Sequence, residues 1–294
     1  KVTLPIMVMN PELNSYDTII DYQLEPEIYS FKVLDLFLKA LRKKGIHEKY
    51  PIHIKLETGM HRLGFRREDL DELLLKIKEN NLRIASIFTH LSSADDPEER
   101  EYTLAQIKLY TDNSDYILAR IDDKPLRHCL NSPGITNYAE YQFDMVRIGI
   151  GMIGHTTNPA IQPLLQSAVC FKTVITQISP LHPGESLGYN RRFKATNDTN
   201  IATIAVGYAD GIPRLLSNGK GFVGIKGKLY PIQGNVCMDM LMVDIGNDPI
   251  EEGDDVIIFN GNPSLEKFAE YCQTIPYEVL TSVSRRVKRI YIKD

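Results

Sequence analysis

The sequence predicts an α/β domain with a parallel sheet, followed by a β-rich domain. In the first part, short apolar stretches rich in β-forming residues alternate with amphipathic helical segments, which is typical of βαβ units. From about residue 165 the chain changes to closely spaced strands separated by Asn- and Gly-containing turns. A length of 294 residues accommodates two domains. We therefore predict one domain over 1–164 and a second over 165–294.

The composition excludes several classes of protein. The chain has 34 Lys and Arg against 38 Asp and Glu, a net charge of −4, and general nucleic-acid binding calls for a basic surface instead. No apolar run approaches the roughly 18 residues of a membrane span, and the first residues do not resemble a signal peptide. The four cysteines are too dispersed for a CxxC metal site. We expect a cytoplasmic protein with no metal, membrane or nucleic-acid partner.

The first part contains six predicted strands and three long helices. The strands are expected over 5–10, about 24–29, 51–57, 85–91, 127–131 and 143–150. The helices are expected over 33–45, 69–80 and roughly 98–119. In the first of these helices the apolar residues recur at helical spacing, so they share one face: Val33, Leu34, Phe37, Leu38 and Leu41.

The second part contains mainly strands. Segments such as AVCFKTVITQISP, TNIATIAVGYADG and DDVIIFNG are rich in β-branched residues and end in turn signals. One helix is evident, over 264–273, with Ser264 as its expected N-cap.

The strand 51–57 places Lys55 on an unusual face. Residues alternate between the two faces of a strand, so Lys55 lies opposite Ile52 and Ile54. The apolar face should meet the helices, which directs Lys55 into the interior, where a lysine is unfavourable unless it is paired or chemically altered. The alternative is an edge strand with a solvated Lys55. The loop after this strand presents Arg62 at the end where parallel sheets bind ligands.

Three later strand ends carry polar groups in the same way. They present His90, Asn131 with Ser132, and Arg147 followed by Gly149. A hydroxyl at Ser132 and the backbone N–H groups of 149–151 suit a phosphate. Each segment alone is more often a plain turn, but together they indicate the rim of one active site.

Two tyrosines in the second part are candidates for proton transfer. Tyr189 and Tyr277 lie in polar segments, and a tyrosine serves as an acid or base when nearby cations lower its pKa. The alternative is a packed ring with a solvated hydroxyl. The basic segment 285–289 is expected to be a solvated face.

Eight segments, in order, resemble the alanine racemase family from end to end. They are KLETGMHRLGF, THLSSAD, NSPGI, FDMVRIGIGMIG, SLGYNRRF, AVGYADGIPR, PIQGNVCMDMLMVDIG and TIPYEVLTSVSRRVKRIY. The resemblance implies a fold-type III pyridoxal-phosphate enzyme, with a TIM barrel followed by a β-rich domain. It also implies L- and D-alanine interconversion for peptidoglycan precursors, by a homodimer whose sites combine both subunits.

The resemblance also implies roles for individual residues. Tyr189 matches a catalytic acid/base that reaches the partner's site, and Arg62 matches the arginine that holds the substrate carboxylate. Lys55 matches a lysine that is carbamylated in many members, where the carbamate steadies this arginine. Arg147 matches the arginine that faces the pyridine nitrogen of the cofactor. The remaining matches are His90 and His128 in the hydrogen-bond network around Arg147, Asn131 in the rim, Ser132, Gly149, Ile150 and Tyr277 at the phosphate, and Tyr208 and Met238 at the pocket mouth.

Two departures from the family pattern stand out. His61 replaces a usual glycine in the loop ETGMHRLG. No stretch matches the family's Schiff-base lysine motif, which resembles VVKADAYGHG. We therefore expect an incomplete (β/α)8 TIM barrel with about six of eight strands, in a polypeptide that lacks this lysine and is inactive alone. The alternatives are a racemase for serine or for a broad range of amino acids, and a non-catalytic module of a larger fused protein.

Overall fold

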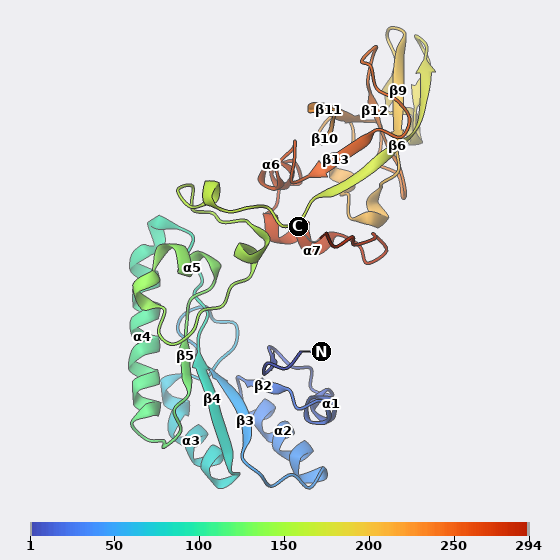
Figure 1. Ribbon diagram of the computed structural model, residues 1–294. Helices are drawn as coiled ribbons and strands as arrows, with labels where there is room; N and C mark the ends of the chain where they lie inside the picture. Colours follow the sequence, from blue (N-terminus) through green and yellow to red (C-terminus); the bar gives the residue numbers. More distant parts are fainter. Residues whose placement is uncertain (1, 293–294) are drawn as a thin grey trace. The chain divides into compact units, whose positions relative to one another are not determined.

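The computed structural model describes residues 2–292 and contains two compact units, Lys1–Gln166 and Ser167–Asp294. Each unit has its own hydrophobic core, and the ribbon is shown in Figure 1. Within the described residues, no helix combines the length and the apolar character that crossing a membrane requires.

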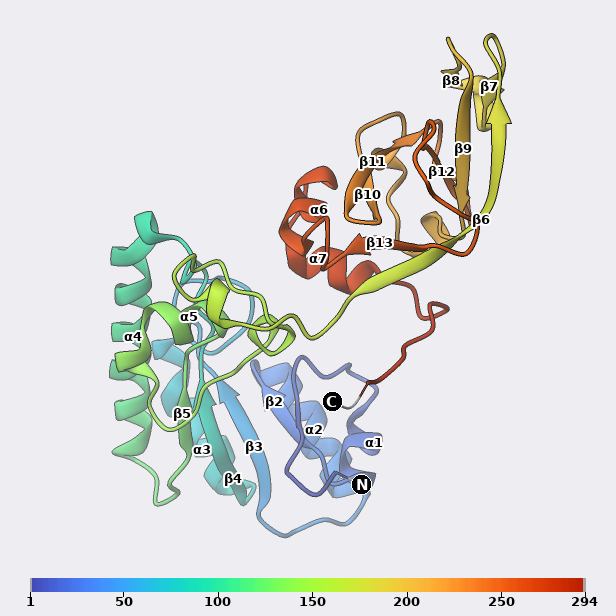
Figure 2. The same cartoon turned by 45° about the horizontal axis from the view of Figure 1, so that its top comes forward.

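The first unit contains a parallel sheet of five strands whose order in the sheet is their order in the chain. The strands are β1 (Met7–Val8), β2 (Glu25–Ile28), β3 (Tyr50–Lys55), β4 (Leu82–Phe88) and β5 (Leu126–His128). Sequential parallel strands with intervening helices are the arrangement of a (β/α)8 barrel. Figures 1 and 2 show the sheet curling, with the long helices along one side. The predicted incomplete barrel is confirmed.

The three long helices of the first unit follow the predicted pattern, whereas its two short helices, Tyr16–Asp21 and Ser132–Asn137, were not predicted. They are α1 (Tyr16–Asp21), α2 (Phe31–Lys43), α3 (Leu70–Glu79), α4 (Arg100–Leu118) and α5 (Ser132–Asn137). The side chain of Ser30 accepts a hydrogen bond from the Val33 N–H and caps α2. The predicted apolar face of this helix is buried, so the helical spacing identified its core-facing side correctly.

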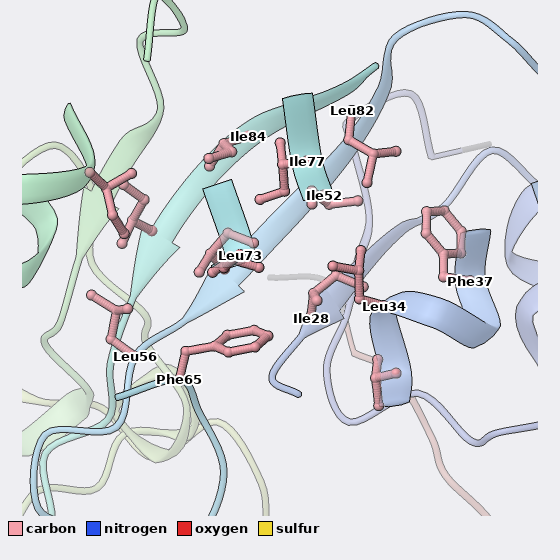
Figure 3. Packing of buried hydrophobic residues seen from close by; sticks show 14 of the residues in the cluster. Ile28, Leu34, Phe37, Ile52, Leu56, Phe65, Leu73, Ile77, Leu82 and Ile84 are labelled. Carbon is pink, nitrogen blue, oxygen red and sulfur yellow. The ribbon is translucent and has the colours of Figure 1, made fainter. Parts of the chain in front are cut away.

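The core of the first unit lies between the helices and one face of the sheet. Ile28 of β2 and Ile52 of β3 pack with Leu34 and Phe37 of α2, and Leu73 of α3 lies beside them (Figure 3). All five side chains are fully buried, and each such burial stabilises the fold by about 1.5–3 kcal/mol. Because the apolar residues occupy this face, the opposite face of the strands is left for polar side chains.

The strand expected over 143–150 does not form, and this prediction was wrong. The segment runs beside β5 but makes only isolated backbone contacts, from Asp144 N–H to Arg127 O at 3.1 Å and from Arg147 N–H to Leu130 O at 3.0 Å. The Asp144 carboxylate accepts the Arg127 N–H at 2.8 Å, a donor that a regular ladder would pair with a backbone carbonyl. Phe143 also has a positive φ of 52°, which interrupts an extended chain.

The second unit is a closed antiparallel barrel, which confirms the predicted β-rich part. The order around it is β10-β11-β12-β9-β6-β13. The strands are β6 (Phe171–Leu181), β9 (Thr199–Ile204), β10 (Phe222–Ile225), β11 (Lys228–Gln233), β12 (Leu241–Asp244) and β13 (Asp255–Phe259), with a separate pair β7 (Ser186–Leu187) and β8 (Phe193–Lys194). Pairing between β10 and β13 closes the barrel, which removes exposed strand edges.

The second unit contains two helices where one was expected. In α6 (Leu265–Tyr271) the predicted N-cap is confirmed, since Ser264 accepts from Lys267 N–H at 3.2 Å. The additional helix is α7 (Pro276–Ser282). Short 3-10 helices complete the chain at Arg67–Asp69, Pro97–Glu99, Ala139–Tyr141, Ile150–Ile153, Gln162–Leu164, Tyr189–Arg191, Tyr208–Asp210 and Arg214–Leu216.

Candidate active site

The sheet face turned away from the helices of the first unit is lined with buried polar groups. They come from β2, β3, β4 and β5, and they are Glu27, His53, Lys55, Ser86 and His128. Alternation along the strands produces this segregation. A register shift lets Ile52 pair with Ile84 and His53 with Ser86, so Ser86 lies opposite His53. The inward direction predicted for Lys55 is confirmed, and the edge-strand alternative is wrong because β3 is paired on both sides.

Lys55 is paired with a carboxylate that the sequence analysis did not identify. Its Nζ lies 3.2 Å from Glu27 Oε1, and the two side chains are only 5% and 1% exposed. The other carboxylate oxygen, Oε2, accepts the Asn10 N–H. A buried lysine therefore has a buried counter-ion on the neighbouring strand.

A continuous hydrogen-bond chain crosses this face and consists of Arg147, His128, Ser86, His53 and Glu25. Arg147 Nη1 lies 2.7 Å from His128 Nδ1, and His128 Nε2 lies 3.0 Å from Ser86 Oγ. Ser86 Oγ lies 2.6 Å from His53 Nδ1, and His53 Nε2 lies 2.8 Å from Glu25 Oε2. Because a guanidinium only donates, each following group accepts at one end and donates at the other. The direction of these hydrogen bonds therefore assigns the neutral tautomer with a proton on Nε2 to both His128 and His53.

The electrostatics around this chain also favour neutral histidines. Burial, and next the Arg147 charge, lower the pKa of His128 to about 3. Burial and then the charges of Arg147, Arg62 and Lys55 lower the pKa of His90 to about 4. For His53, burial lowers the pKa although Glu25 opposes this. Burial also lowers the Arg147 pKa to about 10, so the guanidinium remains charged at neutral pH.

The free energy of unfolding is expected to fall as the pH decreases from about 6.5 to 5. In this window the unfolded chain protonates His90 and His128, whose ordinary pKa is about 6.5, whereas the folded protein keeps these two neutral. The unfolded state then binds more protons than the folded state. Each such histidine therefore contributes up to about 1.4 kcal/mol per pH unit to the slope of the free energy of unfolding against pH. Urea unfolding at several pH values measures the slope.

The variants His90→Gln and His182→Gln make a matched pair for this measurement. His90→Gln should reduce the slope. His182 is exposed and its pKa is raised by Asp198, so His182→Gln should leave the loss of stability below pH 6.5 in place. An unchanged slope in His90→Gln would contradict the burial argument.

The guanidinium of Arg147 also binds the strand ends directly. Nη2 donates to Thr89 O at 2.7 Å and lies 3.4 Å from His90 Nδ1. Asn131 Nδ2 lies 3.5 Å from His90 Nε2, and Asn131 Oδ1 accepts the Gly134 N–H at 3.0 Å. The structure thus brings together the candidates predicted from three separate strand ends.

Three of the residues predicted to bind a phosphate, Ser132, Gly149 and Ile150, also lie together. Ser132 Oγ accepts from Gly149 N–H at 2.8 Å and lies 3.4 Å from Gly151 N. Ile150 lies between these glycines and is buried at the start of a 3-10 helix. The backbone N–H groups of Gly149 and Gly151 therefore converge on the Ser132 hydroxyl beside the end of β5.

Arg62 lies on a loop that closes over the ends of β3 and β4. A hollow there is lined in part by Lys55, Thr58, Arg62, Thr89 and His90. The loop is tied back by Phe65 N–H donating to Lys55 O at 2.9 Å and by the Tyr102 hydroxyl donating to Gly59 O at 2.6 Å. Arg62 and Lys55 therefore face one shared hollow.

His61 occupies a left-handed conformation in this loop, with φ of 53°. An L-residue other than glycine is disfavoured there by about 1–2 kcal/mol. We expect His61→Gly to raise the free energy of unfolding by about 1 kcal/mol, measured by urea unfolding. Asn81 has a similar φ of 52° but donates to His47 O, so Asn81→Gly should give no gain. Destabilisation by His61→Gly would contradict the strain argument.

The candidates of the second unit lie on neighbouring loops. Asn235 Nδ2 donates to Tyr189 O at 3.0 Å, and Tyr208 N–H donates to Cys237 O at 2.9 Å. A Cβ at Gly207 would lie 2.4 Å from the carbonyl oxygen of Met238, so glycine permits this close approach. Tyr189, Tyr208 and Met238 all have exposed side chains.

Tyr277 is the remaining candidate of this unit, and Arg286 is a further residue that the sequence did not single out. Tyr277 lies in the first turn of α7. Arg286 donates to Asp210 at 2.7 and 3.1 Å and also to Asp239, so it joins the loops that follow Tyr208 and Met238. The segment 285–289 is mostly exposed, as expected, and Arg286 forms these surface ion pairs in addition.

Sequence reasoning missed four polar residues that shape these sites: Glu25, Glu27, Ser86 and Arg286. One signal was present, because Glu25 and Glu27 alternate along a predicted strand and so share its face. Within residues 2–292 no group of three or more His, Cys, Asp or Glu is arranged to hold a metal ion.

Two family models match the chain. "Alanine racemase, N-terminal domain" matches residues 1–157, and "Alanine racemase, C-terminal domain" matches residues 168–291. Alanine racemase 1 of Clostridium acetobutylicum is 36% identical over 100% of this chain and 78% of the relative. The alanine racemase of Clostridium difficile 630 is 32% identical with a TM-score of 0.90, covering 99% of this chain and 77% of that one.

A third relative concerns the cofactor. The structure of the alanine racemase of Bartonella henselae, described with covalently bound pyridoxal phosphate, is 28% identical with a TM-score of 0.84, covering 99% of this chain and 80% of that one. Together the two family models account for nearly the whole length of the chain. The chain belongs to the alanine racemase family.

Proposed function

We propose that this protein interconverts L-alanine and D-alanine with pyridoxal phosphate as its cofactor. The observation that carries the proposal is the half-buried Arg147 guanidinium, held by His128 and Thr89. It lies at the end of the sheet where the Ser132 hydroxyl accepts the Gly149 N–H and keeps its own proton to donate to a phosphate. A cation beside a phosphate-type rim suits a phosphorylated pyridine.

The residues present fit this cofactor. Ser132, Gly149, Ile150 and Tyr277 would hold its phosphate, and Arg147 would face its pyridine nitrogen. When bound, pyridoxal phosphate withdraws electrons from the Cα–H bond of an amino acid. Because Arg147 remains a cation that only donates, it keeps the pyridine nitrogen unprotonated. This weakens the electron withdrawal and limits side reactions.

The substrate would be handled by groups of the first unit and by residues that a partner subunit supplies. Arg62 would bind the carboxylate of alanine, and neutral His90 with Asn131 would keep Arg147 in place. Tyr189 would move the proton at Cα, while Tyr208 and Met238 would border the pocket mouth. We propose that these three come from the partner of a cytoplasmic homodimer, which the exposure of their side chains supports.

The test is racemisation by the natural full-length protein supplied with pyridoxal phosphate. We expect D-alanine to form from L-alanine, with serine and other amino acids turned over more slowly, as measured by chiral chromatography. Arg62→Ala should raise the KM for alanine strongly, whereas Arg66→Ala, an exposed arginine four residues further on, should not. Absence of D-alanine would refute the proposal, and equal rates across the amino-acid panel would replace alanine by a broad substrate range.

A further inference from the structure

The buried pair of Lys55 and Glu27 bears on the chemical state of the lysine. The two residues lie on the adjacent central strands β3 and β2. Their side chains are 5% and 1% exposed, and Nζ lies 3.2 Å from Oε1. With so little exposure to solvent, a charge on one of these side chains is stable only beside a charge of the opposite sign.

Glu27 depends on the lysine for neutralisation. Its Oε2 accepts the Asn10 N–H. Its Oε1 accepts no hydrogen bond from the residues that the structure describes, and the Lys55 ammonium is its charged neighbour there. Loss of the positive charge on Lys55 would leave this buried carboxylate without a cation in contact with it, and only the more distant Arg147 charge would act on it, which is strongly unfavourable.

We propose that Lys55 stays an unmodified ammonium and that Glu27 supplies the buried negative charge that a lysine carbamate would otherwise provide. Carbamylation joins a neutral lysine amine to CO2, forms an N–C bond and releases one proton. It would therefore exchange the cation for an anion a few ångströms from the Glu27 carboxylate. Two adjacent buried anions are disfavoured, whereas the pair in the structure is neutral as a whole.

Arg62 does not offset this repulsion. It lines the same hollow as Lys55, but its side chain is exposed, and exposed ion pairs contribute only about 0–1 kcal/mol. Glu27 thereby becomes a positioning residue for Lys55. The inference rests on the geometry of the pair and does not require the proposed racemase activity.

The wild-type state can be measured directly. The natural protein is equilibrated with 13C-bicarbonate and examined by 13C NMR, and 15N-lysine labelling reports the ammonium. We expect no carbamate signal and an ammonium signal that disappears in Lys55→Arg. A 13C carbamate signal in the wild type that is lost in Lys55→Arg would overturn the proposal.

The role of Glu27 is tested with two isosteric variants. Glu27→Gln removes the buried anion, so we expect a carbamate signal that the double variant Glu27→Gln/Lys55→Arg lacks. Glu25→Gln, which removes a carboxylate two residues away that pairs with His53 instead, should show none. A folded Glu27→Gln protein without the signal would refute the blocking role, and if this variant does not fold, the wild-type ammonium measurement decides. Racemisation is assayed separately, so its failure is distinguishable.

Discussion

Replacing Tyr189 by phenylalanine is expected to slow racemisation by about 10²–10⁴-fold in at least one direction, the range that one general acid/base contributes. The phenolic hydroxyl is the only group removed, so the effect should fall on proton transfer. Initial rates from L-alanine and from D-alanine, each with and without deuterium at Cα, identify the direction that is affected. Unchanged turnover in both directions would refute the role of Tyr189.

The structure indicates that this variant keeps its fold. The Tyr189 side chain is 68% exposed, and the contact that anchors the segment is between the backbone carbonyl of Tyr189 and Asn235. Phenylalanine leaves that hydrogen bond in place, so the free energy of unfolding should change by less than about 0.5 kcal/mol. Tyr22→Phe, the same change at another exposed tyrosine, is the control and should affect neither rate nor stability.

Alternation along the strands predicted much of the first unit. The apolar residues of strand 51–57 face the helices and Lys55 faces inward, as period-two spacing requires. The partner of Lys55 was not predictable in the same way, because Glu27 meets it only through the register between β2 and β3. Ser86 contacts His53 only because the register shifts in the β3–β4 pair, and no local sequence pattern indicates such a shift.

The features that the sequence analysis missed or predicted wrongly have physical causes. The segment 143–150 is apolar enough for a strand, but the Asp144 carboxylate takes a backbone donor of β5. Side chains of this kind compete with regular pairing. The helix α7 is short and begins with a proline, so it offers less than two turns of apolar spacing. The role of Arg286 depends on loops far away in sequence, those of Asp210 and Asp239.

Replacing Arg147 by methionine is expected to lower the free energy of unfolding by about 2 kcal/mol. The change leaves Thr89 O and His128 Nδ1 without the donor that lies 2.7 Å from each, and each unsatisfied buried group costs about 1–3 kcal/mol. Relief from burying a cation offsets part of this cost. Arg127→Met is the control. Arg127 lies on β5 and pairs with Asp115, so its replacement should lower the free energy of unfolding by no more than about 1 kcal/mol.

The same substitution should change how the protein responds to acid, and this separates an electrostatic role from mere packing. The Arg147 charge is the second cause, after burial, of the low His128 pKa, and the guanidinium also occupies the nitrogen that would take the proton. In Arg147→Met, the His128 pKa should therefore move up toward its ordinary value, and NMR titration of the histidine signals measures this. As the folded-state pKa approaches the unfolded one, the loss of stability between pH 6.5 and 5 should become smaller. If Arg147→Met lowered stability but left both the His128 titration and this slope unchanged, the guanidinium would be a packing element. The hydrogen-bond chain from Arg147 to Glu25 would then not be set by its charge.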